Sequence, residues 1–224
     1  MRYEVPHETV SGYRRYPYTL FYGYVKLVCR HAQIIKFKNN LINKTIMDDR
    51  AFEEIKKEYD VFYKDLLRHG KLPLWSTGKG FWGGVIADEV YEAFKRIKLH
   101  KHKTFIDLGS GDGKAVMIAA LFCERAVGIE MDNGLFKKSM EMQRKLNIPN
   151  ALLYNDDFHN QSVSGFDVVF VYPDEPMHRG LEKKLLNELT GKLVHYGHHF
   201  HPQNLNVEDR FLVDGNLFTV YNNQ

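Results

Sequence analysis

Cysteine is scarce in this sequence, and so are long apolar runs. The only two cysteines among the 224 residues are Cys29 and Cys123, which stand in apolar helical patterns without the spacing of metal ligands. We expect both to be buried free thiols in a reducing compartment. The most apolar N-terminal stretch, residues 18–29, is interrupted by Lys26 and followed by Arg30, so it is too short and too charged to span a bilayer. No secretory signal pattern precedes it, which predicts a cytoplasmic protein without a membrane span.

A strong charge of one sign is also absent. The net charge of +3 and the pI near 8.7 neither demand nor exclude an anionic partner. The basic side chains of residues 1–50 are Arg2, Arg14, Arg15, Lys26, Arg30, Lys36, Lys38, Lys44 and Arg50, against Glu4, Glu8, Asp48 and Asp49. This basic, tyrosine-rich stretch suits nucleic acid, and it equally suits an amphipathic helix with a solvated basic face.

Apolar periodicity predicts a mostly helical N-terminal region over residues 1–72. One helix is expected over 18–37. Another is expected over 48–70, capped by Asp48 or Asp49, closed by Gly70 and with an apolar face of Phe52, Ile55, Tyr59, Phe62, Leu66 and Leu67. Residues 71–84 combine Pro73 and four glycines with Trp75, Phe81 and Trp82. Because such aromatics are costly to leave in water, we predict an ordered loop there.

Strands and helices then alternate within a predicted domain over residues 73–224. Strands are expected over 104–109, 125–131, 151–158, 166–173 and 192–200, with a terminal hairpin over 210–221. Helices are expected over 85–97, 113–123, 134–146 and 180–189. This alternation predicts an α/β fold whose mostly parallel sheet is covered by helices on both faces.

The stretch "DLGSGDG", residues 107–113, lies between a predicted strand and a predicted helix. Glycines at such a turn permit positive φ and let the backbone approach a ligand closely. The spacing is G-x-G-x-G, with Lys114 where a dinucleotide motif needs its third glycine, and the alanine after Lys114 excludes a Walker sequence. Two carboxylates, Asp107 and Asp112, suit a ligand with a cationic group better than one with phosphates.

Acidic residues also end the next two strands. Glu130 is placed to bind a ribose diol, as the equivalent acid does in dinucleotide folds. Asp156 or Asp157 can accept from an exocyclic amine, and Phe158 can lie against a base. Together these residues describe a site for an adenosine with a cationic, amino-acid-like tail, which fits S-adenosylmethionine.

The segments "FIDLGSGDG", "VGIEMD", "YNDDF" and "FDVVFVYP" stand in the order and spacing of the class I, seven-β-strand S-adenosylmethionine-dependent methyltransferases. The resemblance covers roughly residues 75–224 and implies a Rossmann-like seven-stranded sheet with an antiparallel C-terminal hairpin strand. It implies that the cofactor is S-adenosylmethionine. The residues that the resemblance assigns to it are Asp107, Gly109 and Gly111 around the methionine, Glu130 on the ribose, and Asp157 or Asp156 at the adenine. Ser110 and Phe158 are further candidates for cofactor binding.

Within that class, the sequence looks most like the small protein-lysine methyltransferases without a SET domain, of the archaeal and ATP synthase c-subunit types. The seven-strand histone methyltransferase is a more distant likeness. This implies N-methylation of a protein lysine. An RNA methyltransferase that grips RNA with its basic N-terminal region, a small-molecule methyltransferase, and a non-enzymatic cofactor-binding partner subunit remain alternatives.

The acceptor side is expected at "VYPDEP", residues 171–176. It departs from the Asn/Asp-Pro-Pro-aromatic motif of amine methyltransferases, which argues against DNA, glutamine and RNA adenine acceptors. Tyr172, Asp174 or Glu175 could orient an ammonium group and help it lose a proton, although a proline-rich turn with solvated acids fits equally. Trp75 and Thr77 are candidate cofactor contacts, where related enzymes fold a segment over the cofactor. Aromatic packing of the N-terminal region onto the sheet is equally consistent with this stretch.

The histidines of residues 195–201 form the densest set of metal-ligand side chains. On a continuous strand, His199 and His201 would share one face while His198 pointed to the other. No cysteine joins them and methyl transfer needs no metal, so we predict no metal site.

Overall fold

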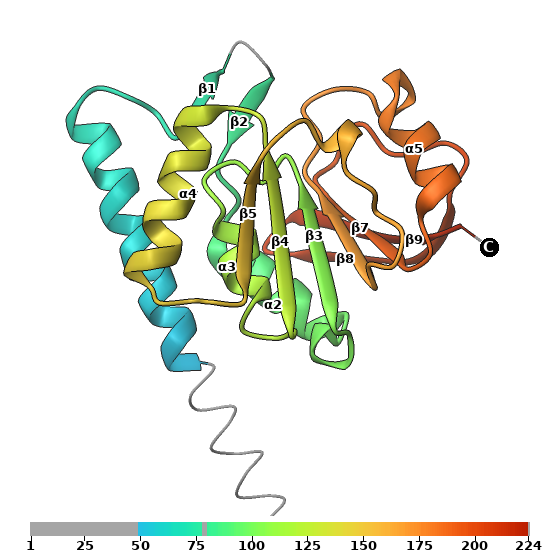
Figure 1. Cartoon of the computed structure of the whole chain (residues 1–224), viewed down its shortest axis with the longest axis horizontal. Coiled ribbons are helices and arrows are strands. Elements are labelled where there is room, and N and C mark those ends of the chain that lie inside the picture. Colours follow the sequence, from blue (N-terminus) through green and yellow to red (C-terminus); the bar gives the residue numbers. More distant parts are fainter. Residues whose placement is uncertain (1–48, 78–79, 224) are drawn as a thin grey trace, which may run out of the picture. The chain divides into compact units, whose positions relative to one another are not determined.

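The computed structural model describes residues 49–77 and 80–223 (Figure 1). Every described residue belongs to one unit, Asp48–Gln224. The predicted helix over residues 18–37, Cys29 and the basic stretch of residues 1–48 lie outside the described residues.

Seven strands form one sheet in the order β5-β4-β3-β6-β7-β9-β8 (Figure 1). Their bounds are β3 Thr104–Leu108, β4 Arg125–Glu130, β5 Ala151–Asn155, β6 Val168–Val171, β7 Lys192–Tyr196, β8 Asn206–Val213 and β9 Asn216–Asn222. Strands β3 to β7 pair in parallel, and β9 is antiparallel to both β7 and β8. The five parallel strands have the order of a dinucleotide-binding fold. The chain builds the sheet outward from β3, first towards β5 and then towards β7, so the strand order changes direction at β3. The predicted α/β architecture with its antiparallel C-terminal hairpin is therefore confirmed.

Helices cover both faces of the sheet, because successive strand residues point to opposite sides. The helices are a segment over residues 49–68, α2 (Ala87–Arg96), α3 (Lys114–Ala119), α4 (Asn133–Lys145) and α5 (Leu181–Glu188). Phe105 packs in one core with the 49–68 helix, α2 and α3. Its neighbour Ile106 packs in a second core with α5.

The 49–68 helix packs on the sheet side through Phe52, Ile55 and Tyr59, as predicted. It ends where predicted, because Gly70 adopts a φ of +69° and the N–H groups of Gly70 and Lys71 donate to the carbonyls of Leu67 and Leu66. Asp48 lies outside the described residues, and Asp49 is already helical.

The predicted apolar face was wrong at one position of this helix. Leu67 is 54% exposed, and Tyr63 is turned inward instead, where it packs against the first core.

Three predicted elements, α3, β5 and β7, end at least three residues earlier than expected. Helix α3 stops at Ala119, after which the N–H groups of Leu121 and Phe122 bond only three residues back. Strand β5 stops at Asn155, because Asp157 caps a short 3₁₀ helix, η2 (Phe158–Asn160).

Strand β7 stops at Tyr196, because Gly197 turns the chain with a φ of +106°. The expected alternation of His198, His199 and His201 on a strand was therefore wrong. These three histidines lie in the connection that leads to β8.

The predicted loop over residues 71–84 was also wrong, since it forms a β-hairpin. Strands β1 (Leu74–Ser76) and β2 (Phe81–Gly83) pair antiparallel, with Trp75 opposite Trp82. The two indole rings contact each other at 4.3 Å between centroids. Such a cross-strand aromatic pair stabilises a short pair of strands. The four glycines of this stretch are unusual in strands, which is why the sequence predicted a loop.

Candidate functional site

The glycine turn after β3 lies at the carboxyl ends of the parallel strands, where the strand order reverses. Gly109, Gly111 and Gly113 have φ values of +80°, +55° and +82°, so the predicted need for glycine is confirmed at all three positions. A Cβ on Gly109 would meet nothing within 4 Å, so the backbone there borders open space, which is called the cleft below. A Cβ on Gly111 would lie 2.4 Å from the indole nitrogen of Trp82. Gly111 therefore lets the hairpin tryptophan pack directly on the turn.

Glu130 joins the end of β4 to this turn. Its Oε2 accepts the backbone N–H of Gly111 (2.7 Å), and its Oε1 accepts the N–H of Asp132 (2.7 Å). Burial raises the pKa of Glu130, and the two backbone donors oppose that shift. The carboxylate predicted to bind a ribose thus stands half-buried beside Gly111, with its orientation fixed by main-chain groups.

Asp107 and Ser110 are the buried polar side chains on either side of Gly109. Burial raises the pKa of Asp107 well above its usual range, and the negative charges of Glu130 and Asp112 add to the shift. The Ser110 side chain lies against β4, because its Oγ would lie 2.8 Å from a Cβ on Gly128. Within the described chain this Oγ has no hydrogen-bond partner.

Asp112, which the sequence suggested for a cationic ligand, is engaged by the 49–68 helix. Its Oδ2 accepts the hydroxyl of Tyr63 (2.6 Å), and its carbonyl accepts the hydroxyl of Tyr59 (2.8 Å). The ammonium of Lys114 lies 4.2 Å from the centre of the Tyr63 ring and donates to the carbonyl of Val85. Burial lowers the pKa of Lys114, which Asp112 partly offsets. These four side chains, Tyr59, Tyr63, Asp112 and Lys114, are called the turn cluster below.

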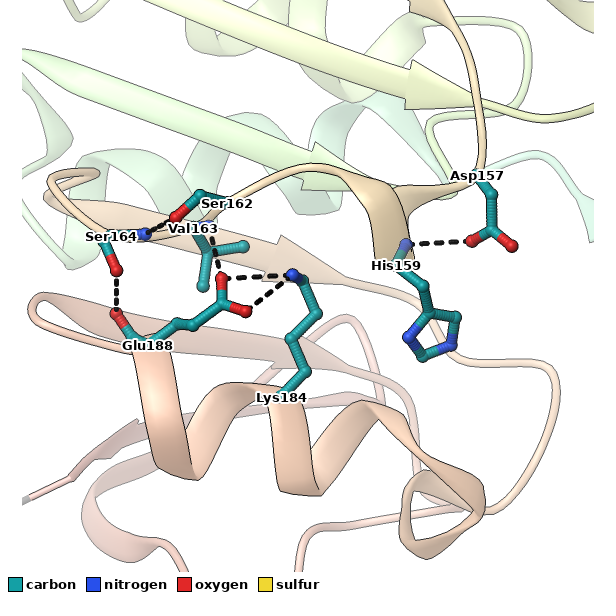
Figure 2. Close-up of polar contacts among 7 residues, drawn as sticks. All are labelled: Asp157, His159, Ser162, Val163, Ser164, Lys184 and Glu188. Carbon is teal, nitrogen blue, oxygen red and sulfur yellow. Dashed lines mark hydrogen bonds and ion pairs between the residues drawn. The ribbon is translucent and has the colours of Figure 1, made fainter.

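The acidic pair after β5 caps the turn that follows it. Asp157 Oδ1 accepts the N–H of His159 (2.8 Å; Figure 2). Asp156 accepts from the side-chain amides of Asn160 and Gln161, and these hydrogen bonds lower its pKa. Both carboxylate oxygens of Asp156 therefore accept hydrogen bonds from its own loop. Asp157 uses Oδ1 to cap the short helix.

Helix α5 holds this loop in place. Glu188 accepts the N–H of Val163 (3.0 Å) and pairs with Lys184 (2.9 Å), while the Ser164 hydroxyl donates to the Glu188 carbonyl (3.1 Å; Figure 2). Phe158, predicted to lie against a base, is half-buried and packs against the second core. The loop that begins with Asp156 and Asp157 is therefore held at its far end by helix α5.

The residues predicted for the acceptor side lie just beyond β6. Tyr172 is 48% exposed, and its ring contacts Tyr196 at 4.7 Å between centroids. The Tyr196 hydroxyl donates to the buried Glu89 of α2 (2.6 Å). Asp174 is exposed, and its Oδ2 accepts the backbone N–H of Phe81 in the hairpin (2.5 Å).

The hairpin contributes residues that sequence reasoning placed only in a loop. The Thr77 hydroxyl bonds within the hairpin, to Gly80. Trp82, which packs on Gly111, was not among the predicted site residues, and neither was Glu89. The aromatic spacing of Trp75 and Trp82 was the available signal for the hairpin, whereas nothing in the sequence marked Glu89.

An apolar cavity of about 570 Å³ lies beside Trp75. It is lined by Phe62, Leu66, Lys71, Leu72, Leu74, Trp75, Gly134, Leu135 and Lys138. Trp75 lines this cavity and contacts Trp82, which packs on the glycine turn. The tryptophan pair therefore links the wall of this cavity to the glycine turn.

Within residues 49–77 and 80–223, no group of three or more His, Cys, Asp or Glu side chains is placed to hold a metal ion. His195 and His201 stack at 4.2 Å between ring centroids, and burial lowers the pKa of His195 to about 3. Cys123 is a buried free thiol as predicted, and its pKa is raised to about 11 by burial. None of the helices in this part of the chain is long and apolar enough to cross a membrane.

Comparison with known proteins agrees with this architecture. The model of the family described as "Histone methylation protein DOT1" matches residues 76–163. An RNA methyltransferase from Salinibacter ruber, solved with S-adenosyl-L-homocysteine, superimposes with a TM-score of 0.52 at 22% identity and covers 59% of this chain and 88% of its own. The tRNA (uracil-54, C5)-methyltransferase of Pyrococcus abyssi gives a TM-score of 0.51 at 16% identity over 63% of this chain and 45% of its own. No curated protein matches the sequence. The chain therefore has the fold of class I methyltransferases.

Proposed function

We propose that this protein is an S-adenosylmethionine-dependent methyltransferase that methylates a lysine side chain of a protein. The match to the histone methylation family carries the proposal, because it runs through β2, the glycine turn, Glu130 and the Asp157 loop. A histone is a protein acceptor, so this match favours a protein over the other acceptor classes.

The cleft fits the proposed cofactor. The open space at Gly109 leaves room for a ligand against the backbone, and the same turn carries the acidic groups Asp107 and Glu130. Lys114 is directed into the turn cluster, so no phosphate-binding cation is supplied from this turn. When bound, S-adenosylmethionine supplies a methyl group on a positively charged sulfur, together with an ammonium group. A pair of carboxyl groups suits that charge.

The protein residues have mainly positioning tasks in such a reaction. Glu130 holds the turn through Gly111 and offers a carboxylate at the strand end. Trp82 covers the turn with an apolar ring and keeps water from that side of the cleft. An attacking amine must be neutral, and the exposed Tyr172 hydroxyl is suited to orient it by hydrogen bonding.

The surface near the cleft also favours a macromolecular acceptor. Leu74, Phe81 and Tyr172 are each about half exposed (48%, 52% and 48%), and Phe81 contacts the loop that carries Tyr172. Exposed apolar side chains of this size are typical of protein interaction sites. An RNA acceptor is the alternative, supported by the basic residues of positions 1–50.

The first test is calorimetric titration of the full-length protein with S-adenosylhomocysteine, with NAD as the control ligand. We expect micromolar or tighter binding of the first and none of the second. Glu130→Ala should weaken binding by about 1.5–3 kcal/mol, the range for a hydrogen bond to a charged group. Absence of S-adenosylhomocysteine binding would remove the main support for a methyltransferase.

The second test identifies the acceptor. The protein is incubated with cell lysate and cofactor labelled in the methyl group, and the label is then challenged with protease or ribonuclease. We expect protease-sensitive label that amino-acid analysis recovers as methyl-lysine, and a reduced rate for Tyr172→Phe. Ribonuclease-sensitive label would replace the lysine acceptor with RNA, while the cofactor assignment would stand.

A further inference from the structure

The backbone N–H of Phe81 faces away from the hairpin to which it belongs. Thr77 donates to the carbonyl of Gly80, and Gly84 donates to that of Pro73, so the pairs 77–80 and 73–84 are hydrogen-bonded. In an antiparallel ladder such pairs alternate with pairs that make no ladder bond. Ser76 and Phe81 form one of the latter, so the Phe81 N–H points outward from the open edge of β2.

Asp174 supplies the acceptor for this outward N–H, from a position 93 residues further along the chain (2.5 Å). Asp174 follows β6, on the acceptor side of the proposed cleft. The contact is close, because a Cβ on Gly80 would lie 2.7 Å from Asp174 Oδ2. The loop after β6 also reaches the hairpin through Tyr172, whose ring would touch a Cβ on Gly83 at 4.0 Å.

The hairpin also contacts the glycine turn, through Trp82 on Gly111. Trp82 is only 7% exposed, whereas Asp174 bonds to the exposed edge of the hairpin at Phe81. An isolated two-stranded hairpin is marginally stable in water, so its place over the cleft depends on such tertiary ties. Asp174 and Trp82 thus connect the hairpin to the ends of β6 and β3 respectively.

We propose that Asp174 is a positioning residue that fastens the β1–β2 hairpin across the cofactor cleft and thereby sets how long the cofactor stays bound. This inference rests on the proposed function, because it needs a ligand in the cleft. It differs from a catalytic role for Asp174, since the carboxylate acts through the hairpin backbone and not on the reacting atoms.

The experiment measures the rate at which S-adenosylhomocysteine leaves the full-length protein. Trp75 and Trp82 are the only two tryptophans of the sequence, so their fluorescence reports on the hairpin alone. In a stopped-flow displacement, Asp174→Ala should speed dissociation about tenfold, as expected for the loss of one exposed hydrogen bond to a charged group. Asp174→Asn keeps an oxygen that can accept the Phe81 N–H, so its rate should stay within about twofold of wild type by the same reasoning.

Glu175→Ala is the matched control, because it removes the neighbouring negative charge, whose ion-pair partner is Arg179 and not the hairpin. It should leave the dissociation rate unchanged. Equal rates for Asp174→Ala and wild type would overturn the proposal. A methyl-transfer rate that collapses in Asp174→Asn while dissociation stays slow would also overturn it, in favour of a catalytic carboxylate. If the wild type binds no S-adenosylhomocysteine, the proposed function itself fails, which is a separate result.

Discussion

At the scale of single residues, Gly109 offers a way to separate ligand binding from folding. Its φ of +80° makes any Cβ costly, but the position of that Cβ is open space. We predict that Gly109→Ala lowers the free energy of unfolding by about 1–2 kcal/mol, the cost of a left-handed conformation. We also predict that it abolishes S-adenosylhomocysteine binding, because the methyl group occupies the cleft. Urea denaturation and calorimetric titration of the same sample measure the two effects.

Gly165 is the matched control for this substitution. Its φ of +81° is nearly the same, and a Cβ there also meets nothing within 4 Å, but it lies before β6, at the opposite end of the parallel strands. Gly165→Ala should therefore lose similar stability and bind S-adenosylhomocysteine as the wild type does. Equal affinity in both variants would mean that the ligand does not lie against Gly109.

Asp107 is expected to lower the free energy of unfolding as pH rises, whereas a salt-bridged aspartate raises it. Burial, together with the negative charges of Glu130 and Asp112, raises its pKa in the folded state. Between the ordinary and the raised pKa, the folded protein holds a proton that the unfolded chain has released. Stability from this group is thus lost as pH rises through that window.

Asp107→Asn cannot titrate, so it should become more stable than the wild type as pH increases. The difference in unfolding free energy should grow by at most about 1.4 kcal/mol per pH unit, the value for one proton. Urea denaturation of both proteins from pH 4.5 to 8 measures this slope. A constant difference across that range would show that Asp107 ionises normally in the folded state.

At the scale of elements, the turn cluster couples the 49–68 helix to the glycine turn. Tyr63 donates to the carboxylate of Asp112, whereas Tyr59 donates only to its carbonyl. Losing a donor to a buried charged group costs about 1.5–3 kcal/mol, and losing one to a neutral group costs about 1 kcal/mol. We predict that Tyr63→Phe destabilises the protein more than Tyr59→Phe, by urea denaturation.

Tyr63→Phe should also weaken cofactor binding, because Asp112 is part of the turn that Gly109 and Gly111 form. A severalfold loss of affinity for S-adenosylhomocysteine in Tyr63→Phe, with a smaller loss in Tyr59→Phe, is the expected calorimetric result. If both variants bind as tightly as the wild type, the helix supports the fold without influencing the cleft.

The sequence predicted the elements that carry strong periodicity and misjudged those that depend on distant partners. Strand β3, the glycine turn and the C-terminal hairpin follow from local patterns of apolar residues and glycines. The β1–β2 hairpin does not, because Asp174 and Gly111, far along the chain, hold it. For the same reason Asp112 suggested a ligand contact, although its partner Tyr63 is 49 residues away.

At the scale of the whole molecule, the 49–68 helix and the sheet share one core. Phe52, Ile55 and Tyr59 pack in the same cluster as Phe105 of β3 and Val116 of α3. An element that contributes to a shared core and to a buried polar cluster unfolds with the rest of its domain. The part of the chain that the structure describes should therefore melt in a single transition.

A ligand of the cleft should move that single transition upward as a whole. At a concentration one hundred times its dissociation constant, S-adenosylhomocysteine stabilises the folded state by about 2.7 kcal/mol. For a chain of this size each kcal/mol raises the melting temperature by about 2–4 °C, so a shift of about 5–10 °C is expected in calorimetric melting. NAD at the same concentration should give no shift, and neither should S-adenosylhomocysteine added to Gly109→Ala. Two transitions, of which the ligand moves only one, would mean that the helix and the sheet unfold separately and that the turn cluster does not couple them.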